Sequence, residues 1–150
     1  MQIKFKKLRK DAVPPKRSTS GAAGFDLTVN SIDYSYEFVK CYSGIAMEIP
    51  PGYVGLLFPR SSICDRALRL SDSVGVIDSD YRGELTAVFD IQRDNWSWLN
   101  DIFPIRRSFY KIGERFAQLV IVPVPEVEYV EADELSATER GAGGYGSTGK

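Results

Sequence analysis

Short runs in which apolar and polar residues alternate cover most of this chain, and the clearest run lies just past its middle. Leu85, Ala87, Phe89 and Ile91 occupy every second position there, with mostly polar residues between them. Alternation with a period of two is typical of a strand that has one buried face. Residues 116–122 are almost all apolar, which instead predicts a strand buried on both faces.

The remaining pattern predicts further short strands joined by turns. Ile3 and Phe5 alternate with lysines in a half-exposed first strand, and other strands are expected at residues 25–29, 36–41, 45–49 and 53–58. One or two helical turns are expected around residues 61–70, capped by Ser61 or Ser62. Many short strands at regular spacing favour an all-β fold, a barrel or sandwich of the jelly-roll kind. The length and the absence of repeats predict a single domain, residues 1–150.

Three segments interrupt this pattern. Residues 18–24 are small and polar, and we expect them to form a loop. The connection 92–108 is long for a link between strands and contains two tryptophans. The last eleven residues, 140–150, contain five glycines, so composition alone predicts a disordered tail.

Composition excludes several classes of function. The formal net charge is −1 and the pI is about 5.5, so we expect no bulk attraction to nucleic acid or to an anionic membrane. No apolar run reaches the roughly 18 residues that a membrane-spanning helix needs. The absence of histidine excludes Ser-His-Asp and Cys-His catalysis and a histidine-ligated zinc site. Two cysteines without a CxxC spacing, and no signal peptide, predict a reduced, cytoplasmic setting, or the host cell interior if the gene is viral.

The sequence Pro59-Arg60-Ser61-Ser62 places a positive charge, two hydroxyls and free backbone N–H groups at an expected strand-to-helix junction. An anionic oxygen needs such donors, so this segment is a candidate phosphate-binding site. The alternative is an exposed arginine followed by a serine that caps the helix.

Residues 75–83 (GVIDSDYRG) set two aspartates and a tyrosine between glycines, just before the strand with the clearest alternation. Asp78 in this segment could take a proton from water at neutral pH without help from a histidine. The alternative is an ordinary hairpin in which aspartate and glycine recur for backbone reasons alone.

The tail combines glycines with residues that suit an anion. Its glycines let the backbone approach an anion closely and point successive N–H groups toward it. Arg140, Ser147 and Thr148 add a charge and two hydroxyls, and the ring of Tyr145 can stack on a base. A flexible linker needs neither the arginine nor the aromatic residue. The tail is not a Walker A loop, because the GKS or GKT ending and the following helix are missing.

Together these segments resemble the homotrimeric dUTP diphosphatases, whose five motifs occur here in the same order. The other two motifs are residues 23–27 (AGFDL) and 113–119 (GERFAQL), and the resemblance spans roughly residues 3–149. It implies a jelly-roll-like distorted β-barrel with one short helix and a mobile tail, residues 140–150, that closes as a lid over a neighbour's active site. It also implies hydrolysis of dUTP to dUMP and pyrophosphate, Mg²⁺ as cofactor, and a homotrimer with shared active sites.

The resemblance assigns a role to each matching residue. Asp78 would activate the water that attacks the α-phosphorus, and Asp26 would reach Mg²⁺ through water. Tyr81 would pack against the deoxyribose and exclude a 2′-hydroxyl. The other expected substrate contacts are Arg60, Ser61 and Gln118 on the phosphates, Arg140, Ser147 and Thr148 on the γ-phosphate, Tyr145 over the uracil, Asp72 in the hairpin at the pyrimidine, and Ser62, Gly75 and Gly146.

Asp72 departs from the family pattern, because many bacterial members have asparagine there. An ionised aspartate only accepts hydrogen bonds, so the strictness of uracil recognition is an open question. The related dCTP deaminases also contain an arginine followed by two serines. Their proton-carrying glutamate corresponds to Val88 here, which cannot transfer a proton, and this disfavours deamination.

The connection 92–108 is the second departure, since it is longer than in compact members. Trp96, Trp98 and Phe103 within it either bind a protein partner or fold back onto the barrel as a small satellite core. A module that binds dUTP and signals through this connection is the non-enzymatic alternative. The presence of Asp78 argues against sensing alone.

Overall fold

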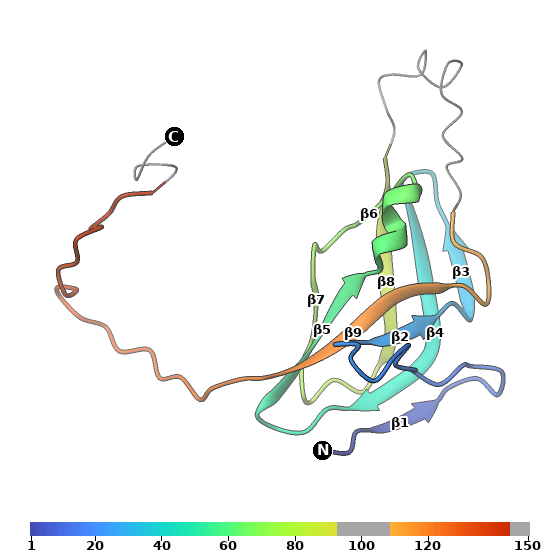
Figure 1. The fold of residues 1–150 in the computed structure, drawn as a ribbon, viewed down its shortest axis with the longest axis horizontal. Helices are drawn as coiled ribbons and strands as arrows, with labels where there is room; N and C mark the ends of the chain where they lie inside the picture. The colour runs from blue at the N-terminus through green and yellow to red at the C-terminus, as the bar shows by residue number, and fades with distance from the viewer. Residues whose placement is uncertain (93–108, 145–150) are drawn as a thin grey trace, which may run out of the picture.

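The computed structural model describes residues 1–92 and 109–144, and nearly all of its regular elements are antiparallel strands (Figure 1). A five-residue 3₁₀ helix, η1 (Ser61–Asp65), interrupts them. The strands are β1 (Lys4–Lys7), β2 (Phe25–Thr28), β3 (Ser31–Tyr34), β4 (Phe38–Glu48), β5 (Tyr53–Pro59), β6 (Leu68–Leu70), β7 (Gly75–Ile77), β8 (Glu84–Ile91) and β9 (Arg115–Pro123).

The strands form two sheets that enclose one core. The first sheet has the order β1-β4-β8-β6, with β3 also paired to β4, and the second has the order β2-β9-β5-β7. Three fully buried rings lie between them: Phe89 of β8 is 5.0 Å from Tyr110 and 6.5 Å from Phe116 of β9, measured between ring centroids. The expected all-β, jelly-roll-like fold is confirmed.

The alternating pattern located the long strands correctly. In β8, Leu85, Ala87 and Phe89 are buried, as their spacing predicts, and Ile91 at the end of the strand is half-buried. The two strands expected at 36–41 and 45–49 are one strand, β4, whose register on β8 shifts between Tyr42 and Ala46. The short strands β3, β6 and β7 were not predicted, because three or four residues are too few to show a period.

The helix differs from its prediction. It ends at Asp65, its N-cap residue is Arg60, and no side chain caps it, so neither Ser61 nor Ser62 has the expected capping role. The chain then enters β6, where Leu68 and Leu70 are buried and the residue between them is exposed. Burying two leucines in the first sheet therefore outweighs continuation of the helix.

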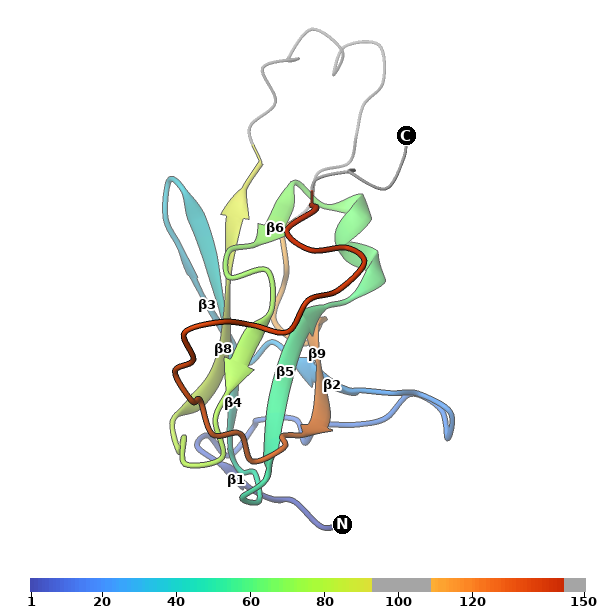
Figure 2. The same cartoon turned by 90° about the vertical axis from the view of Figure 1, so that its left-hand side faces the viewer.

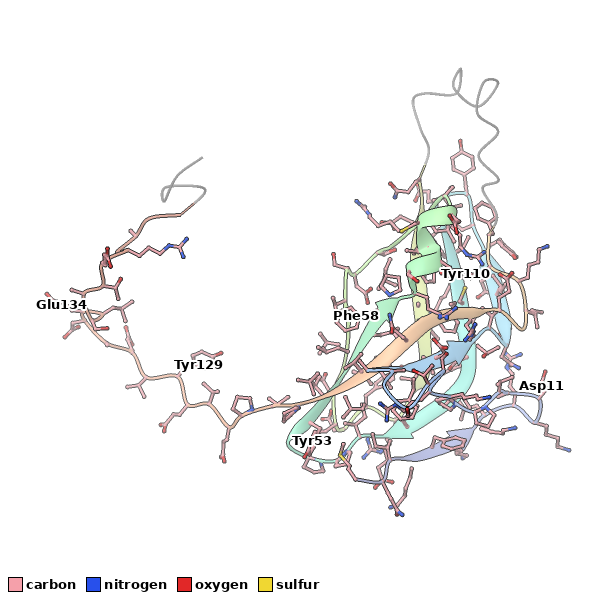
Figure 3. All side chains as sticks on the ribbon, viewed as in Figure 1. Asp11, Tyr53, Phe58, Tyr110, Tyr129 and Glu134 are labelled. Carbon is pink, nitrogen blue, oxygen red and sulfur yellow. The ribbon has the colours of Figure 1, made fainter. Side chains whose placement is uncertain are left out.

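The chain leaves the barrel after β9 as an extended arm, residues 124–144 (Figures 1 and 2). The last backbone hydrogen bond between the arm and the barrel runs from Val124 N–H to the Gly52 oxygen, at 2.8 Å. Tyr129 and Glu134 lie far from both sheets (Figure 3), and Tyr129 is 95% exposed. Within residues 1–92 and 109–144, no helix has the length and apolar character needed to cross a membrane.

Candidate active site

Asp26 on β2 is a nearly buried carboxylate held by two arginines, with only 11% of its side chain exposed. Arg60 Nε lies 2.8 Å from its Oδ1, and Arg115 Nη1 lies 3.0 Å from its Oδ2. The hydroxyl of Ser18 donates a further hydrogen bond to Oδ2 at 2.7 Å. Burial removes water from a carboxylate, so these partners compensate its charge. We call Ser18, Asp26, Arg60 and Arg115 the Asp26 cluster.

Strand pairing places this cluster beside another expected phosphate-binding residue. Asp26 of β2 pairs with Gln118 of β9, which pairs on its other side with Phe58 of β5. Gln118 Nε2 donates a hydrogen bond to the backbone oxygen of Pro59 at 3.2 Å, directly before Arg60. Three neighbouring strands thus bring Asp26, Arg60 and Gln118 to the same end of β5.

Ser61 and Ser62 begin η1 next to this cluster. Ser61 is exposed and Ser62 is half-buried. Because neither hydroxyl caps the helix, both can donate to an anion that binds at Arg60.

The expected pyrimidine hairpin joins β6 to β7. The Asp72 carboxylate lies against Gly75, since a Cβ atom on that glycine would be 3.2 Å from Asp72 Oδ2. Ser71 ties the hairpin to β8 by donating from its hydroxyl to Asp90 Oδ1 at 2.6 Å, and Arg69 lies 3.0 Å from Asp90 Oδ2. The hydrogen bond from Ser71, followed by that from Arg69, lowers the pKa of Asp90.

Asp78 directly follows β7, in the turn to β8, and its side chain is exposed. Its backbone oxygen accepts a hydrogen bond from the Tyr81 N–H at 3.2 Å. An open pocket of about 870 Å³ borders the turn, lined by Asp78 together with Tyr53 and Val124. Asp78 and Tyr81 therefore share one turn, with the carboxylate open to solvent.

Within one chain, the Asp26 cluster and Asp78 lie near opposite ends of β5. Antiparallel pairing with β7 puts Asp78 just beyond the level of Gly55, whereas Arg60 follows the other end of the strand. The strand between Gly55 and Arg60 spans about 16 Å at roughly 3.3 Å per residue. Figure 3 shows the length of β5, with Tyr53 and Phe58 labelled near its two ends. A single chain thus does not bring Asp78 and Arg60 to one phosphate.

Arg140 in the arm is remote from both groups, and its Nε donates to the Gly143 backbone oxygen at 3.0 Å. The expected contacts at Tyr145, Gly146, Ser147 and Thr148 lie outside the described residues, as do residues 93–108 with Trp96, Trp98 and Phe103. The expected lid, and the partner site or satellite core in that connection, stay predictions.

Comparison with known proteins identifies the family. The sequence profile described as dUTPase matches residues 10–95 and 103–149. The chain belongs to the dUTPase family. Deoxyuridine 5′-triphosphate nucleotidohydrolases of Hydrogenobaculum sp. (strain Y04AAS1) and Nautilia profundicola are both 42% identical to it, the first over 99% of each chain and the second over 100%.

A solved member of the dUTPase family has the same fold. The dUTPase of Staphylococcus bacteriophage 80alpha with dUPNHPP superposes with a TM-score of 0.81 at 29% identity, covering 99% of each chain. The resemblance drawn from the five motifs is therefore confirmed by sequence over the full length and by structure.

Two members of the Asp26 cluster were not predicted from the sequence to belong to the candidate site. Arg115 stands in the GERFAQL motif without an assigned role, and Ser18 was assigned only to a loop. Arg115 Nη1 contacts both Ser18 Oγ and Asp26 Oδ2, each at 3.0 Å. A charged residue at the start of a mostly apolar strand is the signal that could have indicated Arg115.

Neither cysteine belongs to the Asp26 cluster or to the turn that carries Asp78. Cys41 is fully buried in the core, and burial raises its pKa to about 12. Its thiol therefore stays protonated and unreactive near neutral pH. Cys64 on η1 is exposed and free.

Proposed function

We propose that this chain is a dUTP diphosphatase that hydrolyses dUTP to dUMP and pyrophosphate. The observation that carries the proposal is 42% identity over the full length to proteins named deoxyuridine 5′-triphosphate nucleotidohydrolase. Binding of a dUTP analogue by the phage 80alpha relative supports the same substrate. The reaction would lower dUTP and supply dUMP for thymidylate synthesis.

The Asp26 cluster would bind the phosphate chain. Arg60 contacts Asp26 through Nε, and within the described residues no other ion pair of Arg60 occurs, so its two terminal nitrogens remain for phosphate oxygens. A guanidinium held from one side loses less freedom when it binds a phosphate with the other. Ser61, Ser62 and Gln118 would supply the neighbouring donors.

Asp78 would accept the proton of the attacking water, so that hydroxide adds to the α-phosphorus as pyrophosphate departs. A carboxylate is the available base, because the chain has no histidine. Attack in line with the leaving group is mainly a matter of positioning and charge compensation. Val88 on β8 corresponds to the proton-carrying glutamate of the dCTP deaminases. A valine cannot transfer a proton, which disfavours deamination.

Tyr81 would pack against the deoxyribose, and the hairpin with Asp72 and Gly75 would hold the uracil. In the phage 80alpha dUTPase, substitutions were made at an aspartate and at a tyrosine three positions later. Asp78 and Tyr81 have the same spacing here. Arg140, Tyr145, Gly146, Ser147 and Thr148 would complete the site as a lid.

We further propose a homotrimer in which different subunits supply the Asp26 cluster, Asp78 and the lid. The separation of Asp78 from Arg60 along β5 supports this arrangement, because base and phosphate donors must meet at one phosphorus. The arm supports it too, since residues 125–140 are exposed along their whole length. The exposed arm carries Val127, Tyr129 and Leu135, which suit burial against another chain.

Asp26 fits an indirect contact with Mg²⁺. An ionised carboxylate has about four acceptor positions, of which Arg60, Arg115 and Ser18 occupy three. Within the described residues no group of three or more acidic or cysteine side chains could enclose a metal. Mg²⁺ carried by the triphosphate keeps several waters, so one remaining acceptor on Asp26 suffices to hold such a water. When bound, Mg²⁺ would neutralise charge on the phosphates.

The test is pyrophosphate release from dUTP by the wild type and by Asp78→Asn. We expect a loss of kcat of about 10³-fold, within the range for removal of a general base. Asp80→Asn is the matched control, because Asp80 is an exposed aspartate of the same turn, and we expect near-wild-type activity.

The same assay with dCTP and dTTP measures uracil recognition in the presence of Asp72. An Asp78→Asn protein as active as the wild type would refute the mechanism. A wild type that releases no pyrophosphate from dUTP would refute the function.

A further inference from the structure

Tyr81 folds back over Gly83 in the turn before β8. Its hydroxyl donates a hydrogen bond to the Glu84 backbone oxygen at 3.1 Å. A Cβ atom on Gly83 would lie 2.3 Å from Tyr81 Oη, 2.5 Å from Cζ and 2.9 Å from Cε2. Non-bonded carbon atoms prefer about 3.5 to 4 Å, so the ring of Tyr81 occupies the space that a side chain at Gly83 would need.

The backbone itself does not require glycine at position 83. Among the described glycines, those with positive φ are Gly44, Gly52, Gly113 and Gly141. Gly83 is not one of them, so an alanine could adopt its backbone conformation. What Gly83 provides is room for the neighbouring ring.

The turn around the ring is otherwise well held. Arg82 Nη1 donates hydrogen bonds to the backbone oxygens of Ser79, at 2.6 Å, and Tyr81, at 2.9 Å. The ring, in contrast, is 44% exposed and forms the far end of a side chain that can rotate. A methyl group at position 83 would therefore displace the ring and break its bond to Glu84, rather than move the backbone.

We propose that Gly83 is a positioning residue that sets discrimination against ribonucleotides by fixing the ring of Tyr81. The inference rests on the proposed function, in which this ring packs against the deoxyribose. A 2′-hydroxyl is rejected only if the ring stays where the hydroxyl would lie. A ring displaced by about 1 Å no longer packs against the deoxyribose and no longer rejects a 2′-hydroxyl.

The experiment compares kcat/KM for dUTP and UTP in the wild type, Gly83→Ala and Gly21→Ala. Gly21 is the matched control, because nothing lies within 4 Å of a Cβ atom there. We expect Gly83→Ala to lower the dUTP-to-UTP ratio about tenfold, out of the roughly hundredfold that packing achieves against an added hydroxyl. Its thermal midpoint should stay near that of the wild type, and Gly21→Ala should change neither quantity.

A second pair of variants tests whether Gly83 acts through Tyr81. If it does, adding Gly83→Ala to Tyr81→Ala changes the ratio no further. An unchanged ratio in Gly83→Ala, or an equal decrease in both backgrounds, overturns the inference. If Gly83→Ala alone does not fold, the double variant should fold, and its failure also overturns the inference. A wild type inactive on dUTP would refute the proposed function instead, and an unchanged ratio in Tyr81→Ala would refute the role of Tyr81.

Discussion

The Asp26 cluster and the turn that carries Asp78 hold their functional groups in opposite ways. In the cluster, ion pairs to Arg60 and Arg115 fix a carboxylate that is 11% exposed. In the turn, Asp78 and Tyr81 are exposed, and the hydrogen bonds found there run to backbone oxygens. The carboxylate of the Asp26 cluster is thus fully paired within one chain, whereas Asp78, the proposed base, is open to solvent.

This difference concerns the surroundings of the two carboxylates. Those of Asp26 are formed within one chain, whereas those of Asp78 are still open to solvent. Buried, paired charges keep their positions without a ligand, which suits binding of a flexible triphosphate. An exposed aspartate on a surface turn is accessible to a second chain. The contrast is consistent with the proposed site shared between subunits, and the following predictions test it.

The largest expected effect is the recovery of activity when two inactive variants are mixed. We expect Arg60→Ala and Asp78→Asn each to lower kcat/KM by about 10³-fold. Co-refolded together, they should regain measurable activity, because some sites then combine an intact Arg60 from one subunit with an intact Asp78 from another. The measurement is pyrophosphate release from the mixture against the sum of the separate proteins. A mixture no more active than that sum would contradict shared sites.

Removal of residues 141–150 should lower turnover at least about hundredfold, because the proposed lid donors for the γ-phosphate are lost. The barrel and the arm up to Arg140 remain, so the number of subunits in the oligomer should not change. Light scattering and pyrophosphate release measure the two quantities on one sample. Full activity of the truncated protein would remove the lid from the mechanism.

Asp26→Asn should destabilise the protein by about 2 kcal/mol, because it leaves two neighbouring arginines without their counter-charge. This value is at the low end for a broken ion pair, since Arg115 is about half exposed. Urea unfolding of the variant against Asp80→Asn measures it. Equal stability of the two variants would show that the cluster is not held by its charges.

Asp90→Asn should have the smallest effect, fully present at neutral pH and declining as the pH falls below 3.8. The pKa of Asp90 is lowered in the folded protein from its ordinary value of 3.8, so its contribution is present above that value and lost as the pH falls through the folded pKa. Because the Asp90 side chain is partly exposed, its contribution to the free energy of unfolding is small. The urea midpoints of wild type and variant should differ slightly at pH 7, and the difference should shrink as the pH falls below 3.8. A difference between the two urea midpoints that grows as the pH falls would contradict the lowered pKa of Asp90.

Much of the fold followed from residue patterns, but the contacts of the site did not. The alternation in residues 85–91 correctly predicted that Leu85, Ala87 and Phe89 of β8 are buried, whereas Ile91 at the end of the strand is half-buried. The partners of Asp26 could not be predicted, because Arg115 is 89 residues away along the chain. The capping role predicted for Ser61 or Ser62 was wrong, since η1 is a 3₁₀ helix of five residues without a side-chain cap.

The amino-acid sequence by itself determined the all-β class, the chemical groups available and the dUTPase family, because each depends on residue types and their order. Tertiary structure decided which groups meet. The pairing of β2, β9 and β5 brings Asp26 and Arg60 to 2.8 Å, and the antiparallel pairing of β5 with β7 keeps Asp78 at the far end. Strand register fixes such distances, and register depends on how two whole sheets bury their apolar faces.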